Sequence, residues 1–205
     1  MSARVWQATI AAFLPALTAV GLARAAAPDT DPLSSYVTAI SAQLDPCVAQ
    51  TLVQLVGTDR QLLALRSYLR SAPHLAERWS WTQEQIEAFE GSPEQRDLQQ
   101  EIDWVRTAFV AANPGFEVYV NSQVRSLNVQ VEHWNSNESV KAAAREILAA
   151  AQALLLSPDF PANRPEQARE ALKAFLYGHK PEPMPTIAAP GLSLHGQMRA
   201  IDFQV

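Results

Sequence analysis

An imidazole and a carboxylate, those of His195 and Asp202, lie seven positions apart near the end of the sequence. If residues 200–205 form a strand, the two-residue period turns Asp202 and the small Ala200 toward one face. His195 comes from the loop just before, so the two side chains could converge on one divalent metal ion such as zinc. The same spacing also arises when a loop histidine lies near a solvated aspartate, and both interpretations stay open.

A second candidate residue is Arg125, which follows a strand-like run at residues 116–121 and stands at the start of a predicted helix. A guanidinium group stays charged and offers paired donors to the oxygens of a carboxylate. It could therefore bind an anionic substrate or stabilise negative charge in a transition state. Taken alone, Arg125 also fits a solvated residue at a helix start.

The segment around His195 resembles a signature of the zinc D-alanyl-D-alanine carboxypeptidase and dipeptidase family. That signature reads Ser-x-His-x-x-Gly-x-Ala-x-Asp, and this sequence matches it in register at Ser193, His195, Ala200 and Asp202. It departs at Met198, where the family usually has a glycine, a residue that accepts a positive φ at little cost.

The segment around Arg125 is similar to a second motif of the same family, Ser-Gly-Tyr-Arg-Ser-x-x-x-Gln. The matching residues are Ser122, Arg125, Ser126 and Gln130, and a Gln-Val pair replaces the usual Gly-Tyr. In the family this motif also follows a strand and opens a helix. Two matched segments in the same order favour the family over coincidence.

The resemblance implies a zinc metallopeptidase that cuts peptidoglycan peptides, with D-alanine at the cleaved bond. The residue roles that it implies are zinc ligation by His195 and Asp202, a catalytic role for Arg125, and substrate binding by Ser122, Gln130 and Ser193. The resemblance covers about residues 114–205, where it implies part of a Hedgehog/D,D-peptidase-like domain. The expected fold class is α+β, with a helical extension before that domain.

A catalytic zinc takes three protein ligands and a water. In the family, a Glu-x-x-His-like element downstream supplies the third ligand and the catalytic base. Because residues 203–205 contain neither, we expect either the N-terminal part of a longer protein or a natural truncation that has lost catalysis. Glu132 and His133 have suitable residue types, but they directly follow the arginine segment, and we interpret them as part of a surface helix.

Periodicity predicts mostly helices. Residues 34–113 have helical spacing, with one helix start at Ser92-Pro93, where Gln95 could bond back to the cap. A strand is predicted at residues 116–121 and another at 200–205. Between them we expect a short helix that ends near residue 134, a helix at 138–156, a helix at 165–177 and an extended segment at 180–190. The strand at 200–205 should turn Ile201, Phe203 and Val205 to the core, and no later segment could pair with it.

The N-terminus predicts export. Arg4 precedes an apolar run at residues 8–23, and small residues then favour cleavage near Ala25 or Ala26. An uncleaved membrane anchor is the alternative, but the run is short and contains Pro15. We therefore expect a signal peptide at 1–25, a periplasmic or secreted protein, and no stable membrane span after cleavage.

The remaining boundaries follow from composition. We expect a linker at about 26–33, a helical extension that with this linker spans 26–113, and a helical insertion in the peptidase-like domain at about 138–178.

The formal charge of −5 argues against a nucleic-acid partner. A single cysteine, Cys47, excludes an internal disulfide and fits a buried thiol. The rival function is a non-catalytic, exported helical module that binds cell-wall material or a protein partner. Under that interpretation, the core or contact residues would include Trp79, Trp81, Trp104 and Trp134.

Overall fold

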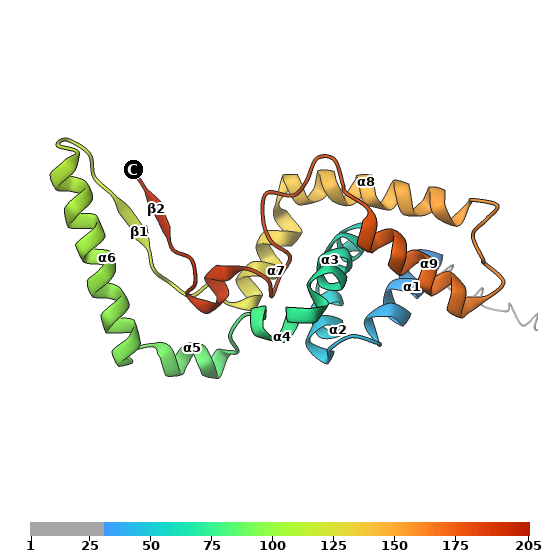
Figure 1. Ribbon diagram of the computed structural model, residues 1–205, viewed down its shortest axis with the longest axis horizontal. Coiled ribbons are helices and arrows are strands. Elements are labelled where there is room, and N and C mark those ends of the chain that lie inside the picture. The colour runs from blue at the N-terminus through green and yellow to red at the C-terminus, as the bar shows by residue number, and fades with distance from the viewer. Residues whose placement is uncertain (1–30) are drawn as a thin grey trace, which may run out of the picture. The chain divides into compact units, whose positions relative to one another are not determined.

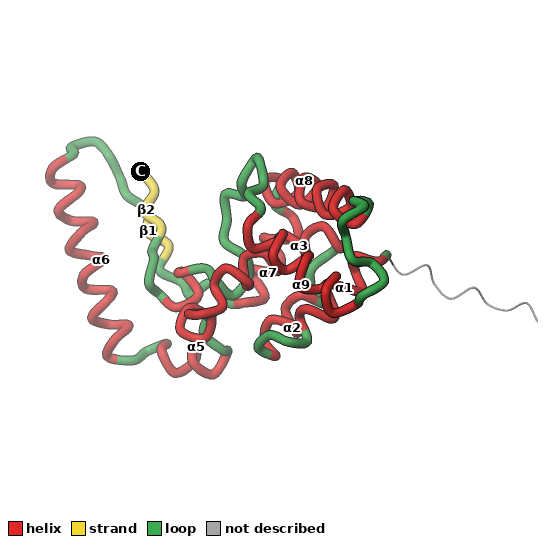
Figure 2. The backbone as a smooth tube through the Cα atoms, turned by 45° about the vertical axis from the view of Figure 1, so that its right-hand side comes forward, coloured by secondary structure: helices red, strands yellow, loops and turns green. Residues whose placement is uncertain are grey.

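The computed structural model describes residues 31–205, so the expected signal peptide at 1–25 lies outside the described part of the chain. Of the expected linker, only residues 31–33 are described, and the first helix already begins at Pro32. The described part is mostly helical and contains one two-stranded sheet (Figures 1 and 2).

The first helices begin at Asp-Pro pairs. They are α1 (Pro32–Ser41) and α2 (Pro46–Leu52), and they are followed by α3 (Gly57–Ser71). Asp31 and Asp45 each accept a hydrogen bond from a backbone N–H of the first turn, while the proline has no N–H to leave unpaired. Local chemistry is therefore enough to start α1 and α2.

Four short or exposed elements follow α3. They are the 3-10 helix η1 (Ala72–His74), α4 (Leu75–Arg78), α5 (Gln83–Phe89) and α6 (Pro93–Ala112). The predicted start of α6 is confirmed, since Ser92 Oγ accepts from Gln95 N at 3.1 Å. The Gln95 side chain, however, accepts from the N–H of Gly91 at 2.6 Å rather than from that of the cap residue.

Three predicted helices of the second half are also confirmed as α7 (Leu127–Ser136), α8 (Glu138–Leu155) and α9 (Pro165–Gly178). Helix α3 packs against α1, α2, α8 and α9, so it lies at the centre of the core. The fully buried side chains include Tyr68 of α3, Trp134 of α7 and Ile147 of α8. The core thus draws on helices from both sides of the boundary expected near residue 113.

The sheet pairs β1 (Tyr119–Asn121) with β2 (Asp202–Gln204) in antiparallel fashion, and Asn121 stands opposite Asp202. The expectation that the last strand has no partner was wrong, because its partner lies about 80 positions earlier in the chain. The expected inward face is also wrong, since Phe203 is 44% and Val205 73% exposed. A two-stranded ribbon has no second layer here to cover that face.

The chain between α9 and the 3-10 helix η2 (Leu194–Gln197) forms no helix or strand and bends at residues 182–183 and 186–187, so it is less extended than the prolines predict. Buried donors of α3 hold it in place. The hydroxyl of Tyr68 donates to the carbonyl oxygen of Pro190 at 2.8 Å, and Arg66 Nε donates to that of His179 at 2.6 Å. These bonds bring η2 and β2 to the ends of α4 and α7.

Among the described helices, none has both the length and the apolar character that crossing a membrane requires.

Candidate functional site

Three side chains from separate elements meet at Asp202. One carboxylate oxygen, Oδ2, lies 3.0 Å from Nη2 of Arg125, and the other, Oδ1, lies 3.5 Å from Nε2 of His195. Arg125 comes from the loop before α7, His195 from η2, and Asp202 is the first residue of β2. The structure thus brings together the imidazole, carboxylate and guanidinium that the sequence singles out.

Main-chain bonds position these three residues. The sheet register places Asp202 opposite Asn121, close to the segment that leads to Arg125. The N–H of Arg125 then donates to the carbonyl oxygen of His195 at 3.1 Å. Between η2 and β2 the chain turns at Met198, whose φ of 53° is left-handed. A glycine at this position would adopt that conformation freely, whereas methionine adopts it at a steric cost.

Gln130 holds the segments behind the site. It is 5% exposed, and its Nε2 donates to Ser80 Oγ at 2.8 Å and to the carbonyl oxygen of Arg125 at 2.7 Å. Its Oε1 accepts from the N–H of Gly191 at 2.9 Å. The amide is therefore occupied by protein groups, and its contribution to the site is to fix the positions of the surrounding loops.

A cavity of about 520 Å³ opens beside these residues. Its polar lining residues include Arg78, Arg125, His133, His195 and Asp202. Two guanidinium groups thus line a cavity that holds one carboxylate, and two imidazoles add further polar groups. The second guanidinium favours a ligand with an anionic end, such as the terminal carboxylate of a peptide.

The open geometry leaves the site accessible to a ligand. The side chains of His195 and Arg125 are 21% and 28% exposed, and that of Asp202 is 45% exposed. Apolar side chains, among them Ile187 and Leu192, line another part of the cavity. An ion or substrate could therefore reach the carboxylate while the guanidinium keeps it in place.

The separation of the His195 and Asp202 donor atoms would allow both to bind one zinc ion. Two ligands at zinc-ligand distances in a tetrahedral site lie about 3.3 Å apart, and Nε2 of His195 lies 3.5 Å from Oδ1 of Asp202. Oδ2 would remain paired with Arg125, which fixes the carboxylate orientation. Within residues 31–205, no third His, Cys, Asp or Glu side chain completes a group of this kind.

The other predicted site residues are placed differently. Ser193 lines the same cavity, with its neighbour Leu194. Ser122 instead lines a separate cavity, shared with Glu90 and Gln95, so the structure does not bring it to Arg125. Gln130 borders the main cavity, but its amide is bonded to protein.

Two lining residues were missed by sequence reasoning. His133 is exposed, but the helix that carries it, α7, also buries Gln130 and Trp134, and His133 borders the cavity. Its position three residues after Gln130, on the same helix face, was a usable signal. Arg78 belongs to the short α4 and is about 47 positions from Arg125, so no local pattern pointed to it.

Comparison with known proteins adds no relative. No protein-family model matches the chain, and no curated protein or solved structure matches it. The family membership that the two motifs suggest therefore stays a prediction.

Proposed function

We propose that the cavity at Asp202 is the zinc- and substrate-binding part of a D-alanyl-D-alanine carboxypeptidase-like metallopeptidase. The protein would be exported and would act on peptidoglycan peptides, through a Hedgehog/D,D-peptidase-like domain at about residues 114–205. One observation carries the proposal: the carboxylate of Asp202 faces His195 with one oxygen and Arg125 with the other.

In this function, His195 and Asp202 would hold the ion, and Arg125 would fix the orientation of the Asp202 carboxylate. Zinc, when bound, would polarise the scissile carbonyl and lower the pKa of a bound water. Arg125 and Arg78 would bind the terminal carboxylate of the peptide, and Ser193 lies within reach of the same cavity. The chemistry also needs a third protein ligand and a general base. These groups would come from outside residues 31–205.

Zinc binding tests the proposal directly. Zinc affinity would be measured by competition with a chromophoric chelator for the chain and for His195→Ala and Asp202→Asn. Loss of one of two protein ligands should weaken binding by about tenfold or more. His74→Ala is the matched control, because His74 is exposed and pairs only with Glu77, at 3.6 Å. Equal affinity in all four proteins would contradict the proposal.

Activity requires a separate measurement. D-alanine release from a synthetic peptide ending in D-alanyl-D-alanine would be followed with the protein encoded by the full reading frame, in added zinc. We expect His195→Ala and Arg125→Ala each to lower kcat/KM by about 100-fold or more. Activity that survives His195→Ala would end the zinc assignment.

A second candidate function is a non-catalytic binding module. It is favoured by a set of exposed apolar side chains on α6 and next to it. Trp104 is 73%, Phe116 58% and Tyr119 66% exposed, and exposed apolar patches mark interaction surfaces. A chain that binds no zinc at His195 but retains a partner through Trp104 would favour this function.

A further inference from the structure

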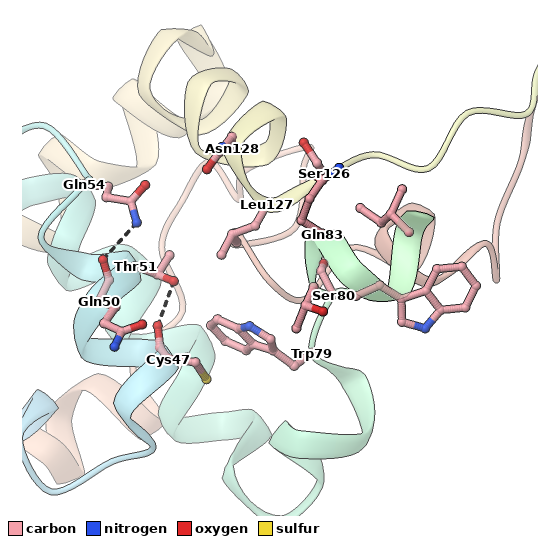
Figure 3. A pocket seen from close by; sticks show the side chains of 13 residues that line it. Cys47, Gln50, Thr51, Gln54, Trp79, Ser80, Gln83, Ser126, Leu127 and Asn128 are labelled. Carbon is pink, nitrogen blue, oxygen red and sulfur yellow. Dashed lines mark hydrogen bonds between the residues drawn. The ribbon is translucent and has the colours of Figure 1, made fainter. Parts of the chain in front are cut away.

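A second cavity, of about 320 Å³, lies on the other side of the Ser80–Gln130 hydrogen bond. Its walls come from α2, from the segment between α4 and α5, and from the first turn of α7. Figure 3 shows the indole of Trp79 between Cys47 of α2 and Ser80. Trp81, from the same segment, lines the cavity as well. Nothing in the proposed peptidase chemistry uses this space.

The lining of the second cavity is uncharged and combines apolar side chains with polar ones. Gln50, Gln83 and Asn128 contribute amides, and none of the described lining residues is ionised at neutral pH. Cys47 does not change this, because burial, with a smaller effect from Asp45, raises the pKa of its thiol to about 12. The contrast with the first cavity is clear, since that one holds two guanidinium groups. An ionic ligand would find no partner here.

Several of these amides are available to a ligand. Gln50 and Asn128 are exposed, and their side chains make no hydrogen bond to another described residue (Figure 3). Gln83 donates to Glu87 at 3.0 Å and keeps its carbonyl oxygen free. Each amide offers both donors and acceptors, which is what a ligand carrying several hydroxyl groups requires.

The two indoles are held in place before any ligand binds. A Cβ at Gly191 would lie 2.7 Å from the Trp79 ring, so only the bare glycine backbone allows the ring to lie against it. Trp79 also packs on Tyr68, with ring centroids 5.7 Å apart, and Trp81 packs on Phe89 at 5.1 Å. Rigid aromatic rings lose little conformational entropy when a ligand binds.

We propose that this cavity binds a neutral saccharide, one or two rings of a glycan chain. The apolar C–H face of a sugar ring stacks on an indole, while its hydroxyl groups bond to side-chain amides and to Ser126. The volume lies at the lower end of the range for small-molecule sites, about 300–1,000 Å³. The saccharide class rests on the cavity itself. Only the choice of an N-acetylated, cell-wall-type chain rests on the proposed peptidase function.

The two cavities share a wall. Ser126 of the second cavity directly follows Arg125 of the first, and Gln130 Nε2 donates both to Ser80 Oγ and to the Arg125 carbonyl oxygen. A glycan held in the second cavity would therefore lie next to the site proposed for the peptide. This arrangement would let the protein select a peptide that is still attached to its glycan.

The test is to titrate the protein with the N-acetylglucosamine trimer and to measure binding by isothermal titration calorimetry and by tryptophan fluorescence. We expect saturable binding and a change in emission, because the two indoles line the cavity. The double variant Gln50→Ala/Asn128→Ala removes two exposed amides that the fold does not use, and should weaken binding about tenfold. Trp81→Ala should abolish it, provided that circular dichroism shows an unchanged helix content.

Trp104→Ala is the matched control, since Trp104 is 73% exposed on α6 and lies outside the cavity lining. It should bind the trimer with unchanged affinity. His195→Ala should also bind it normally, which separates this proposal from the zinc site. A glucose trimer that binds better than the N-acetylated one would keep the saccharide class and count against the cell-wall assignment. Absence of binding by both trimers, or equal binding by the Gln50→Ala/Asn128→Ala variant, would overturn the proposal.

Discussion

The backbone N–H of Arg125 donates a hydrogen bond to the carbonyl oxygen of His195 at 3.1 Å. This bond joins the two segments that carry the candidate site, although 70 positions separate them in the sequence. Their side chains then meet through Asp202, which lies 3.0 Å from the guanidinium and 3.5 Å from the imidazole. A main-chain bond behind the site thus fixes the distance between groups that face the cavity.

Gln130→Ala should destabilise the fold more than any single hydrogen bond would suggest. The substitution leaves the buried N–H of Gly191 and the carbonyl oxygen of Arg125 without their partner. We expect the free energy of unfolding to fall by about 2–4 kcal/mol, measured by urea denaturation. Ser80→Ala is the control, because it removes only the bond from Gln130 Nε2 to Ser80 Oγ and should cost about 1 kcal/mol. Equal losses in the two variants would contradict the role given to Gln130.

Met198→Gly should stabilise the protein, an unusual direction for a change to glycine. Met198 has a φ of 53°, the one positive φ among the described non-glycine residues. Glycine removes the steric cost of that conformation but adds entropy to the unfolded chain, so the net gain should be up to about 1 kcal/mol. Met198→Val should lower stability instead, because a β-branched residue tolerates a positive φ poorly. Thermal unfolding monitored by circular dichroism would rank the three proteins, and a glycine variant less stable than the valine variant would refute this account.

The thiol of Cys47 should react slowly at pH 8. Burial, followed by the hydrogen bond to and the charge of Asp45, raises its pKa from 9.0 to about 12. Since the thiolate is the nucleophile, the pH profile of iodoacetamide alkylation should have its midpoint well above 9. Asp45→Asn keeps the side-chain oxygen that caps α2 but removes the charge, and should move the midpoint part of the way down. A midpoint near 9.0, the ordinary pKa of this thiol, would contradict the assignment.

The same shift predicts how stability depends on pH. The folded thiol keeps its proton to higher pH than the unfolded one, so folding binds a proton above pH 9. The contribution of Cys47 to stability is complete below that pH and is lost as the pH rises toward about 12. Cys47→Ala should therefore show a flatter loss of unfolding free energy between pH 9 and the highest pH at which the protein stays folded. Parallel pH curves for the two proteins would count against it.

Arg125→Gln should affect ligand binding far more than stability. The Arg125–Asp202 pair is partly exposed, at 28% and 45%, so its loss should cost under about 1 kcal/mol of unfolding free energy. Removing a charged donor to a substrate carboxylate should weaken binding of D-alanyl-D-alanine about 10- to 100-fold, as measured by calorimetry. Arg106→Gln is the matched control, since Arg106 also forms an exposed ion pair, at 3.3 Å with Asp103 of α6. Equal dipeptide affinity in both variants would argue against a substrate role for Arg125.

The sequence by itself predicted the helices because their signals are local. Ser92 at the start of α6 and Asn137 at the start of α8 each accept a hydrogen bond from a backbone N–H of the first turn, and Pro165 at the start of α9 has no N–H to leave unpaired. The absence of a helix at residues 180–190 also follows from local chemistry, because prolines interrupt helices. The resemblance of two short motifs to a peptidase family also singled out His195, Asp202 and Arg125, because both motifs are contiguous and their order along the chain is readable.

Only the tertiary structure decided how these elements meet. The partner of β2, the contact of Asp202 with Arg125 and the burial of Gln130 all join segments tens of positions apart, and no local rule determines such pairings. The structure also left Phe203 exposed, because a two-stranded ribbon has no covering layer. Likewise, Trp79 and Trp81 line an uncharged cavity only because α2, α5 and α7 surround their segment. Caps and turns depend on near neighbours, whereas cavities depend on which distant surfaces the packing brings together.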